Sequence, residues 1–315
     1  MKILLTGSNG YIGSHLYSNL IKFHTIVRGI RAGSKNEDSS AKVIDFKTGQ
    51  GMQNACEDID CVIHCAYDSV DQFSNITAIQ HLLKVISKSR VKKLILFGTF
   101  ATYDNSSYEG ISESSKKSLW NFKYLSVKNK IESLISEYLS AVGPGLEVVY
   151  LQPTIVTDGQ GGWENFRRNL QKFDQIIIPY GGLGYFNSID RDQLSNAVIR
   201  SMEIKNSYFS EARSGFIKCL ISGSEVKRWK EWLVEDPKID GRKISISNLN
   251  QLNESYCKDL FLSVYYGGAS ALVNTRTFGI EKLSFKSYYS SGLDRITMRC
   301  AGLVDIGYAK YLGVL

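Results

Sequence analysis

The chain has 315 residues, of which 43% are hydrophobic and 22% charged, with 27 glycines and four prolines. This composition excludes a disordered, collagen-like or disulfide-stapled chain and predicts a globular enzyme. The formal charge of +7 arises from 38 Lys and Arg against 31 Asp and Glu. Because this excess is mild and spread along the chain, charge alone does not decide between nucleic acid and a small anionic ligand.

The six cysteines form no CxxC pair and no zinc-binding spacing, so we expect no metal site and a reducing compartment. No stretch approaches the ~18 apolar residues that a membrane span needs. The apolar N-terminal run leads into glycines instead of a signal-peptide cleavage site. The sequence therefore predicts a soluble, cytoplasmic protein without a membrane partner.

Apolar segments of strand and helix length alternate through the first half of the chain. Short apolar runs predict strands, whereas apolar residues at three- and four-residue steps predict helices. The expected strands are 2–5, 25–30, 42–45, 61–64, 94–97 and 147–151, and the expected helices are 11–22, 76–86 and a long one beginning near 121. This alternation predicts an α/β fold with a doubly wound, parallel Rossmann sheet.

The regular alternation ends after Pro153, where paired glycines separate shorter and less regular segments. At ~150 residues per domain, the length allows two domains. We expect a dinucleotide-binding Rossmann domain over 1–155 and a smaller substrate-binding lobe over 156–315, with 189–200 returning to the first domain.

A glycine-rich loop, TGSNGYIG at 6–13, joins the first strand to the first helix. Gly7 suits a tight exit from the strand, Gly10 lets a pyrophosphate approach the backbone, and Gly13 lets the helix pack against the sheet. The helix N-terminus would face the phosphates with unpaired N–H groups. The residues predicted to bind a dinucleotide here are Gly7, Asn9, Gly10, Tyr11, Ile12 and Gly13.

The end of the second strand bears on which dinucleotide is bound. An acidic residue there would accept a hydrogen bond from the 2′-hydroxyl of NAD. The segment instead carries Arg28 and Arg31, followed by Ser34 and Lys35, with no acid before Glu37. Either arginine could neutralise a 2′-phosphate, which favours NADP. NAD stays possible, since the arginines could also be solvated residues at a strand end.

Tyr124 and Lys128 are four residues apart in the long expected helix, so they share one helix face. A lysine cation beside a phenol, helped by an oxidised nicotinamide ring, lowers the pKa of tyrosine from ~10 and permits acid–base work near neutral pH. A surface tyrosine beside an extended lysine is the alternative. The position after the fifth strand favours catalysis, because open α/β sheets bind ligands at strand carboxyl ends. Asp45 and Phe46, ending the third strand, are expected to meet the adenine.

Four segments together resemble the extended short-chain dehydrogenase/reductase family, in the NAD-dependent epimerase/dehydratase-like branch that modifies nucleotide sugars. These segments are TGSNGYIGSHL at 6–16, DIDCVIHCA at 58–66, VKKLILFGTFATY at 91–103 and the pair Tyr124 and Lys128. The motif-bearing part of the chain covers about 1–155.

The resemblance implies a role for each matching residue. Tyr124 would be the proton donor or acceptor, Lys128 would also hold the nicotinamide ribose, and Thr99 would bond the same substrate oxygen. Further cofactor contacts implied by the family are Cys65, Ala66 and Pro153. We expect His64 to be a structural residue at a strand end.

The reaction implied by the resemblance is hydride transfer at a carbinol or keto carbon of a nucleotide-linked sugar, in surface polysaccharide biosynthesis. Phe100 and Ala101 stand where the family's 4,6-dehydratases carry Asp and Glu, and neither can move a proton. Ala101 also replaces the cysteine that some epimerase/reductases need. We therefore expect 4-keto-sugar reduction or epimerisation, with reduction favoured if the cofactor is NADP.

The second half departs from the family pattern. The arginine that commonly grips the substrate diphosphate is missing after Gly184, and Arg167, Arg168 or Lys172 could replace it or form a solvated basic face. Two alternatives therefore stay open, a reductase of a small non-nucleotide carbonyl and a non-catalytic dinucleotide-sensing protein. The family also implies a homodimer through the 76–86 and 127–138 helices. Because Arg28, Arg31 and Lys128 have expected roles at the cofactor and active site, we expect no nucleic-acid partner.

Overall fold

The computed structural model describes residues 1–34, 41–103, 111–117, 123–142, 145–161, 164, 168, 176–177, 185–203, 215–223, 226–236, 238–239 and 244–245. The chain divides into two compact units. The first, called the Rossmann unit below, comprises residues 1–99, 123–152 and 191–219, and the second comprises residues 100–122, 153–190 and 220–315.

The Rossmann unit is built on a seven-stranded sheet of order β3-β2-β1-β4-β5-β6-β10 in the described part of the chain. The strands are β1 (Lys2–Thr6), β2 (Thr25–Ile30), β3 (Ala41–Val43), β4 (Cys61–His64), β5 (Lys93–Phe97), β6 (Glu147–Pro153) and β10 (Phe216–Ile221). All neighbouring pairs from β3 to β6 are parallel. The doubly wound parallel sheet predicted from the sequence is confirmed.

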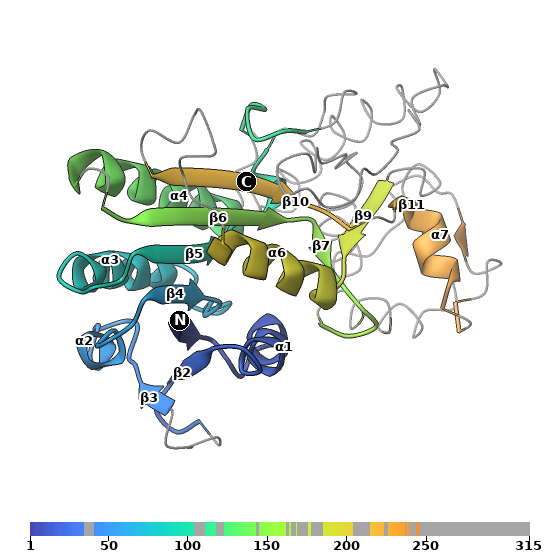
Figure 1. Cartoon of the computed structure of the whole chain (residues 1–315). Coiled ribbons are helices and arrows are strands. Elements are labelled where there is room, and N and C mark those ends of the chain that lie inside the picture. The colour runs from blue at the N-terminus through green and yellow to red at the C-terminus, as the bar shows by residue number, and fades with distance from the viewer. Residues whose placement is uncertain are drawn as a thin grey trace. The chain divides into compact units, whose positions relative to one another are not determined.

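Helices cover both faces of this sheet (Figure 1). On one face α1 (Tyr11–Leu20) packs against α6 (Arg191–Glu203). On the other face lie α2 (Met52–Ala55), α3 (Ser74–Ile86) and α4 (Lys123–Val142), with α3 between its two neighbours. Parallel sheets need such cover, because both faces of their strands are apolar.

The core lies between the sheet and the α3–α4 layer. Leu82 on α3 and Ile135 on α4 are fully buried in one cluster with Leu4, Val62 and Leu94 of the central strands. Burial of each such side chain stabilises the fold by about 1.5–3 kcal/mol. This layer fixes α4, and with it the predicted catalytic face, against β5 and β6.

Helix α6 is anchored to α1 by polar contacts. The Arg191 guanidinium lies 4.5 Å from the centroid of the Tyr11 ring and donates to the Tyr11 carbonyl at 3.3 Å. The His15 imidazole meets the Asp192 carboxylate at 2.8 Å. These contacts hold the start of α6 beside the first turn of α1, the helix that follows the glycine-rich loop.

The second unit contains short strands. β7 (Ile155–Val156), β9 (Tyr185–Ile189) and β11 (Val226–Arg228) form one sheet, and β8 (Ile176–Ile177) pairs with β12 (Ile244–Ser245). The 3₁₀ helix η1 (Phe100–Thr102) and α7 (Trp229–Val234) also belong to it. Among the described residues of the whole chain, no helix is both long and apolar enough to cross a membrane.

Some of the sequence-predicted residues fall outside the described part of the chain, namely Lys35, Arg167 and Lys172. Arg168 is described, and its Nε donates to the Glu164 carbonyl at 3.3 Å, a spacing of four residues that suits a helix. The arrangement of the predicted diphosphate contacts therefore stays a prediction.

Candidate dinucleotide and catalytic site

The predicted site residues of the Rossmann unit gather where the strand order reverses. β1 lies between β2 and β4, so the chain leaves β1 in one direction and β4 in the other. Ligands of open α/β sheets bind at the carboxyl ends of the strands at such a switch point. Thr6 and His64 close these two strands, and the Thr6 Oγ1 and His64 Nδ1 atoms share a hydrogen bond of 2.8 Å.

Two glycines of the loop after β1 are required by sterics. Gly7 has a φ of +67°, and a Cβ on it would lie 2.6 Å from the backbone nitrogen of Ala66. A Cβ on Gly13 would lie 2.1 Å from the Gly7 carbonyl oxygen. Side chains at these positions would collide with backbone, so the loop packs onto β4 and onto the first turn of α1 only as glycine.

The N-terminus of α1 has the chemistry of an anion site. Gly10 is the N-cap, no side chain caps the helix, and its first turn contains no acid. The first N–H groups of a helix lack partners within the helix and carry partial positive charge. Ile12 is partly buried in this first turn and Tyr11 packs beneath Arg191. The loop therefore fits the pyrophosphate of a dinucleotide.

Arg28 braces the glycine-rich loop from within. It is only 6% exposed, its Nε donates to the Ser8 hydroxyl at 3.3 Å, and its Nη2 donates to the Asn9 Oδ1. Its guanidinium lies 4.9 Å from the centroid of the Tyr17 ring. The alternative of a solvated arginine is wrong for Arg28, because Ser8, Asn9 and Tyr17 enclose it.

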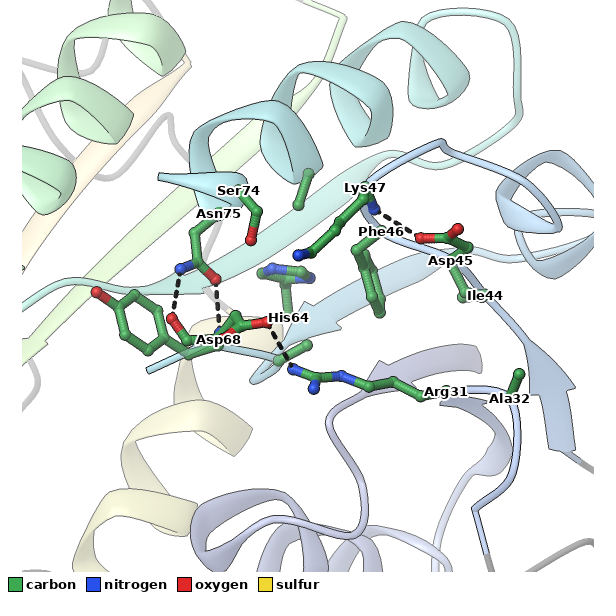
Figure 2. A pocket seen from close by; sticks show the side chains of 13 residues that line it. Arg31, Ala32, Ile44, Asp45, Phe46, Lys47, His64, Asp68, Ser74 and Asn75 are labelled. Carbon is green, nitrogen blue, oxygen red and sulfur yellow. Dashed lines mark hydrogen bonds and ion pairs between the residues drawn. The ribbon is translucent and has the colours of Figure 1, made fainter. Parts of the chain in front are cut away.

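A cavity of about 270 Å³ adjoins the switch point, lined by residues 31–32, 44–47, 64, 66–68, 74–75 and 78 (Figure 2). Arg31 extends along its rim toward Asp68, with 3.8 Å between the Nη2 and Oδ2 atoms. The Arg31 side chain is 63% exposed, in contrast to Arg28. Arg31 is thus the arginine that can meet a ligand entering the cavity.

Asp45 and Phe46 form one wall of this cavity, as the adenine prediction requires. Hydrogen bonds from Thr48 and Lys47 hold the pKa of the Asp45 carboxyl below its usual range. The Phe46 ring meets the His64 ring nearly edge to face, with 5.4 Å between centroids. The wall therefore combines a carboxylate acceptor with an aromatic surface, which suits a purine.

His64 fits the structural role expected for it. Burial, with the Lys128 charge adding to it, lowers the pKa of His64 to about 3. The imidazole is therefore neutral at physiological pH, buried beside Phe46 and bonded to Thr6. A group held neutral by burial in this way packs the site and exchanges no proton near pH 7.

Three predicted catalytic residues come together at the carboxyl end of β5. Tyr124 and Lys128 lie one turn apart on α4, and Tyr124 is hydrogen-bonded to the Thr99 side chain. The Lys128 Nζ lies 5.7 Å from the centroid of the Tyr124 ring and donates to the Phe97 carbonyl at 2.7 Å. Hydroxyl, phenol and ammonium thus share one small volume.

Burial sets the pKa values of this group in the protein by itself. Burial raises the pKa of Tyr124 to about 12, although the Thr99 hydrogen bond opposes the rise, and burial lowers the pKa of Lys128 to about 8. The lowering of the pKa of Tyr124 by Lys128 together with an oxidised nicotinamide ring stays a prediction. At neutral pH the phenol is protonated and the lysine is charged.

The remaining predicted contacts are distributed unevenly. Ala66 lines the cavity, and its N–H donates weakly to the Thr6 hydroxyl at 3.4 Å. Cys65 is partly buried, and burial raises the pKa of its thiol, so it is protonated. Pro153 is buried as the last residue of β6. Nothing in the described structure places Pro153 or Cys65 against the cavity.

The sequence analysis missed several residues of the site. Among them, Tyr67 and Lys47 line the cavity, and Ser8 holds Arg28. Tyr67 comes three residues after β4 and Lys47 four residues after β3, so their positions near strand ends were the available signal. The sequence alone does not show that their side chains turn toward the switch point.

Comparisons with known proteins agree with this geometry. Residues 3–157 match the model of the NAD dependent epimerase/dehydratase family. A search of curated proteins finds no match to the chain.

Solved structures of low sequence identity share the fold. The UDP-glucuronic acid 4-epimerase from Bacillus cereus in complex with NAD has 20% identity, with 78% of this chain and 86% of that chain covered and a TM-score of 0.60. The UDP-glucose 4-epimerase from Thermotoga maritima with UDP-glucose has 18% identity, coverage of 78% and 85%, and a TM-score of 0.61. A dTDP-4-dehydrorhamnose reductase from Clostridium acetobutylicum has 15% identity, coverage of 80% and 86%, and a TM-score of 0.60.

At these identities the structural likeness shows the fold alone, whereas the family model matches the N-terminal half. Residues 3–157 belong to the NAD dependent epimerase/dehydratase family.

Proposed function

We propose that the protein is an NADP-dependent oxidoreductase or epimerase acting at a carbinol or keto carbon of a nucleotide-linked sugar. The carrying observation is the cluster of Thr99, Tyr124 and Lys128 in the same unit as a cavity and loop that fit a dinucleotide. Structural neighbours that include nucleotide-sugar epimerases and a nucleotide-sugar reductase support this substrate class.

The chain's own residues would handle the proton. Tyr124, protonated at neutral pH, would donate its phenolic proton to the carbonyl oxygen in the reductive direction. Thr99 would hold that same oxygen through its hydroxyl. The Lys128 cation would stabilise the phenolate that forms. The dinucleotide, when bound, supplies or accepts the hydride at its nicotinamide ring.

The preference for NADP rests on Arg31. Its guanidinium is exposed at the cavity rim, at the end of β2 where a 2′-phosphate would lie. Lys47 adds a second cation to the same cavity. Asp68 pairs with Arg31 and Asp71 with Lys47, so a bound phosphate would have to replace these carboxylates.

Net reduction is the form of the reaction that this cofactor favours, with epimerisation as the alternative. Phe100 and Ala101 are buried in η1 and contribute no acid or base, which argues against a 4,6-dehydratase. A reductase of a small carbonyl compound that carries no nucleotide remains the second candidate, because the predicted diphosphate-binding arginine is missing from its usual place.

We also propose a homodimer through α3 and α4. The exposed side chains of these helices are largely polar, including Gln80 and Lys84 on α3 and Lys130 and Glu137 on α4. An interface there would therefore be held by polar contacts in its outer part. Light scattering at working concentration tests this, and a monomer would refute it.

Calorimetric titration of the purified protein with NADP, NAD and nucleoside diphosphates tests the binding half of the proposal. Binding of NADP tighter than NAD, together with binding of a nucleoside diphosphate to the NADP complex, is the expected result. Failure to bind any dinucleotide would refute the function. Binding of NADP without any nucleoside diphosphate would favour the small-carbonyl reductase.

A further inference from the structure

Tyr67 lies against both members of the Tyr124–Lys128 pair, although it comes from a different part of the chain. It comes three residues after the end of β4 and lines the cavity. The Lys128 Nζ lies 4.5 Å from the centroid of the Tyr67 ring. The Tyr67 and Tyr124 rings meet nearly edge to face, with 5.6 Å between centroids. Tyr67 therefore contacts the cation and the phenol together.

The segment carrying Tyr67 is held firmly. The buried Asn75 side chain accepts a hydrogen bond from the Asp68 N–H at 2.8 Å and donates to the Asp68 carbonyl at 2.9 Å (Figure 2). The Asp68 carboxylate in turn accepts the N–H groups of Val70 and Asp71. These bonds fix the backbone next to Tyr67, so its ring is placed by the fold.

The Lys128 ammonium needs stabilisation in this place, because only 8% of the residue is exposed. The titratable groups that face it are His64, Cys65 and Tyr67 from β4 and its following loop, and Tyr124 from α4. Their pKa shifts leave all four uncharged at pH 7. Among the described residues, the Phe97 carbonyl at 2.7 Å and the Tyr67 ring at 4.5 Å therefore attract the ammonium from closer than the Tyr124 ring at 5.7 Å.

The hydroxyl of Tyr67 has a different status. It is buried and has no hydrogen-bond partner among the described residues. Native proteins rarely leave a buried hydroxyl unpaired, because desolvation without a bond is unfavourable. Since Tyr67 lines the cavity that fits a dinucleotide, a ligand oxygen is the partner that the site can supply.

We propose that Tyr67 is a positioning residue for the Tyr124–Lys128 pair, whose ring face holds the Lys128 ammonium and whose hydroxyl donates to an oxygen of the bound dinucleotide. The hydroxyl part rests on the proposed function. The ring part concerns the protein alone. The two parts can be separated, because phenylalanine keeps the ring and removes the hydroxyl, whereas leucine removes both.

The ring is tested without any cofactor. The pH dependence of reductive methylation at Lys128, followed by mass spectrometry of its peptide, reports the titration of that amine. We expect Tyr67→Leu to lower the Lys128 pKa by about one unit, since a desolvated ammonium loses a cation–π contact. Tyr67→Phe should leave the pKa unchanged. Equal titration in wild type and the leucine variant would overturn the ring part.

Phe73 offers a matched control. Its ring centroid lies 4.9 Å from the Nζ atom of Lys123, which is on α4 like Lys128. In contrast to Tyr67, however, Phe73 is exposed. Phe73→Leu should not change the Lys128 titration, and an equal shift there would also overturn the assignment to Tyr67. If Tyr67→Leu does not fold, Tyr67→Met, which fills similar space without a π face, is measured in its place.

The hydroxyl is tested by calorimetric titration with NADP. Tyr67→Phe should bind about fivefold to tenfold more weakly than wild type, as expected for one lost hydrogen bond. Unchanged affinity would overturn the hydroxyl part. If wild type itself bound no dinucleotide, the proposed function would fail together with the hydroxyl part, while the Lys128 titration would still decide the ring part.

Discussion

The side chains of Thr99 and Tyr124 are hydrogen-bonded, although one follows β5 and the other lies in the first turns of α4. This bond opposes the effect of burial and favours the phenolate. The same bond holds the Tyr124 phenol beside the Thr99 hydroxyl, so both groups can bond one substrate oxygen. Thr99 and Tyr124 are thus the two side chains through which this fold would bind and protonate a substrate oxygen.

Removing the Tyr124 hydroxyl should abolish most turnover while leaving cofactor affinity nearly unchanged. General acid–base catalysis contributes about 10²–10⁴-fold, so Tyr124→Phe should reduce kcat by about that factor. Steady-state kinetics with NADPH and a nucleotide 4-keto sugar measures it. Tyr138→Phe, which removes a hydroxyl elsewhere on α4, is the control and should retain wild-type turnover.

Cofactor preference should depend on the sign of charge at the cavity rim. Arg31→Asp should weaken NADP binding by about tenfold or more and improve NAD binding, because a carboxylate repels the 2′-phosphate and accepts from a 2′-hydroxyl. Asp68→Asn should tighten NADP, since it releases Arg31 from its carboxylate partner. Dissociation constants from calorimetry decide both.

Arg90→Asp is the matched control for that charge change, because Arg90 is similarly exposed and pairs with Asp58 and Asp60. It should leave the ratio of the NADP and NAD affinities unchanged. If Arg31→Asp altered that ratio no more than Arg90→Asp does, Arg31 would not be the residue that reads the 2′-phosphate.

Acid should destabilise the protein through His64. Its pKa is near 6.5 when unfolded and lowered to about 3 in the fold, so the unfolded state binds the proton first and stability falls as the pH drops from 6.5 toward 3. The loss is about 2 kcal/mol by pH 5. Urea midpoints at pH 7 and pH 5 measure it. The difference should shrink in His64→Asn, and an undiminished difference would assign the acid sensitivity elsewhere.

The buried Lys128 ammonium should lower the free energy of unfolding at neutral pH, and this destabilisation should diminish as the pH rises. Its pKa falls from 10.5 to about 8 on folding, so the unfolded state binds more protons between these values and wild-type stability rises through this window. The full shift corresponds to roughly 3 kcal/mol. Relative to Lys128→Met, wild type should therefore gain stability from pH 7.5 to pH 10. A constant difference in unfolding midpoints would contradict this.

The sequence predicted the sheet well, because buried parallel strands are continuous apolar runs. The strands at 25–30 and 61–64 have the predicted bounds. The third strand ends at Val43 instead of residue 45, because Asp45 turns the chain by accepting the Lys47 N–H and donating its own N–H to Gln50. Such a turn depends on one side chain and is hard to distinguish from a strand end.

The sequence analysis expected residues 189–200 to return to the first domain, but it assigned neither the helix α6 nor the strand β10. β10 and α6 complete the Rossmann unit, and α6 carries buried Leu194, Val198 and Met202 at helical spacing. Their local sequence patterns are those of any helix or strand. That α6 and β10 belong to the Rossmann unit depends on packing against α1 and β6, which are distant in the chain. Local periodicity carries no information about such partners.

The residues of the candidate site likewise fall into two groups, those recognisable from local sequence and those whose contacts are distant in the chain. Tyr124 and Lys128 were predicted because their relation is a local helix spacing, and the glycines because their loop is contiguous. Tyr67 was missed because its contacts join the loop after β4 to α4. The raised pKa of Tyr124 was missed for a related reason, since burial is set by the whole fold.

The most direct test of the proposed function is the absorbance at 340 nm of NADPH mixed with a UDP-linked 4-keto sugar and either wild-type protein or Tyr124→Phe. Wild type should consume NADPH in step with sugar reduction, and the variant should lose at least 100-fold of that rate. Equal rates in the two proteins, or no consumption by wild type with any nucleotide-linked keto sugar, would contradict the account.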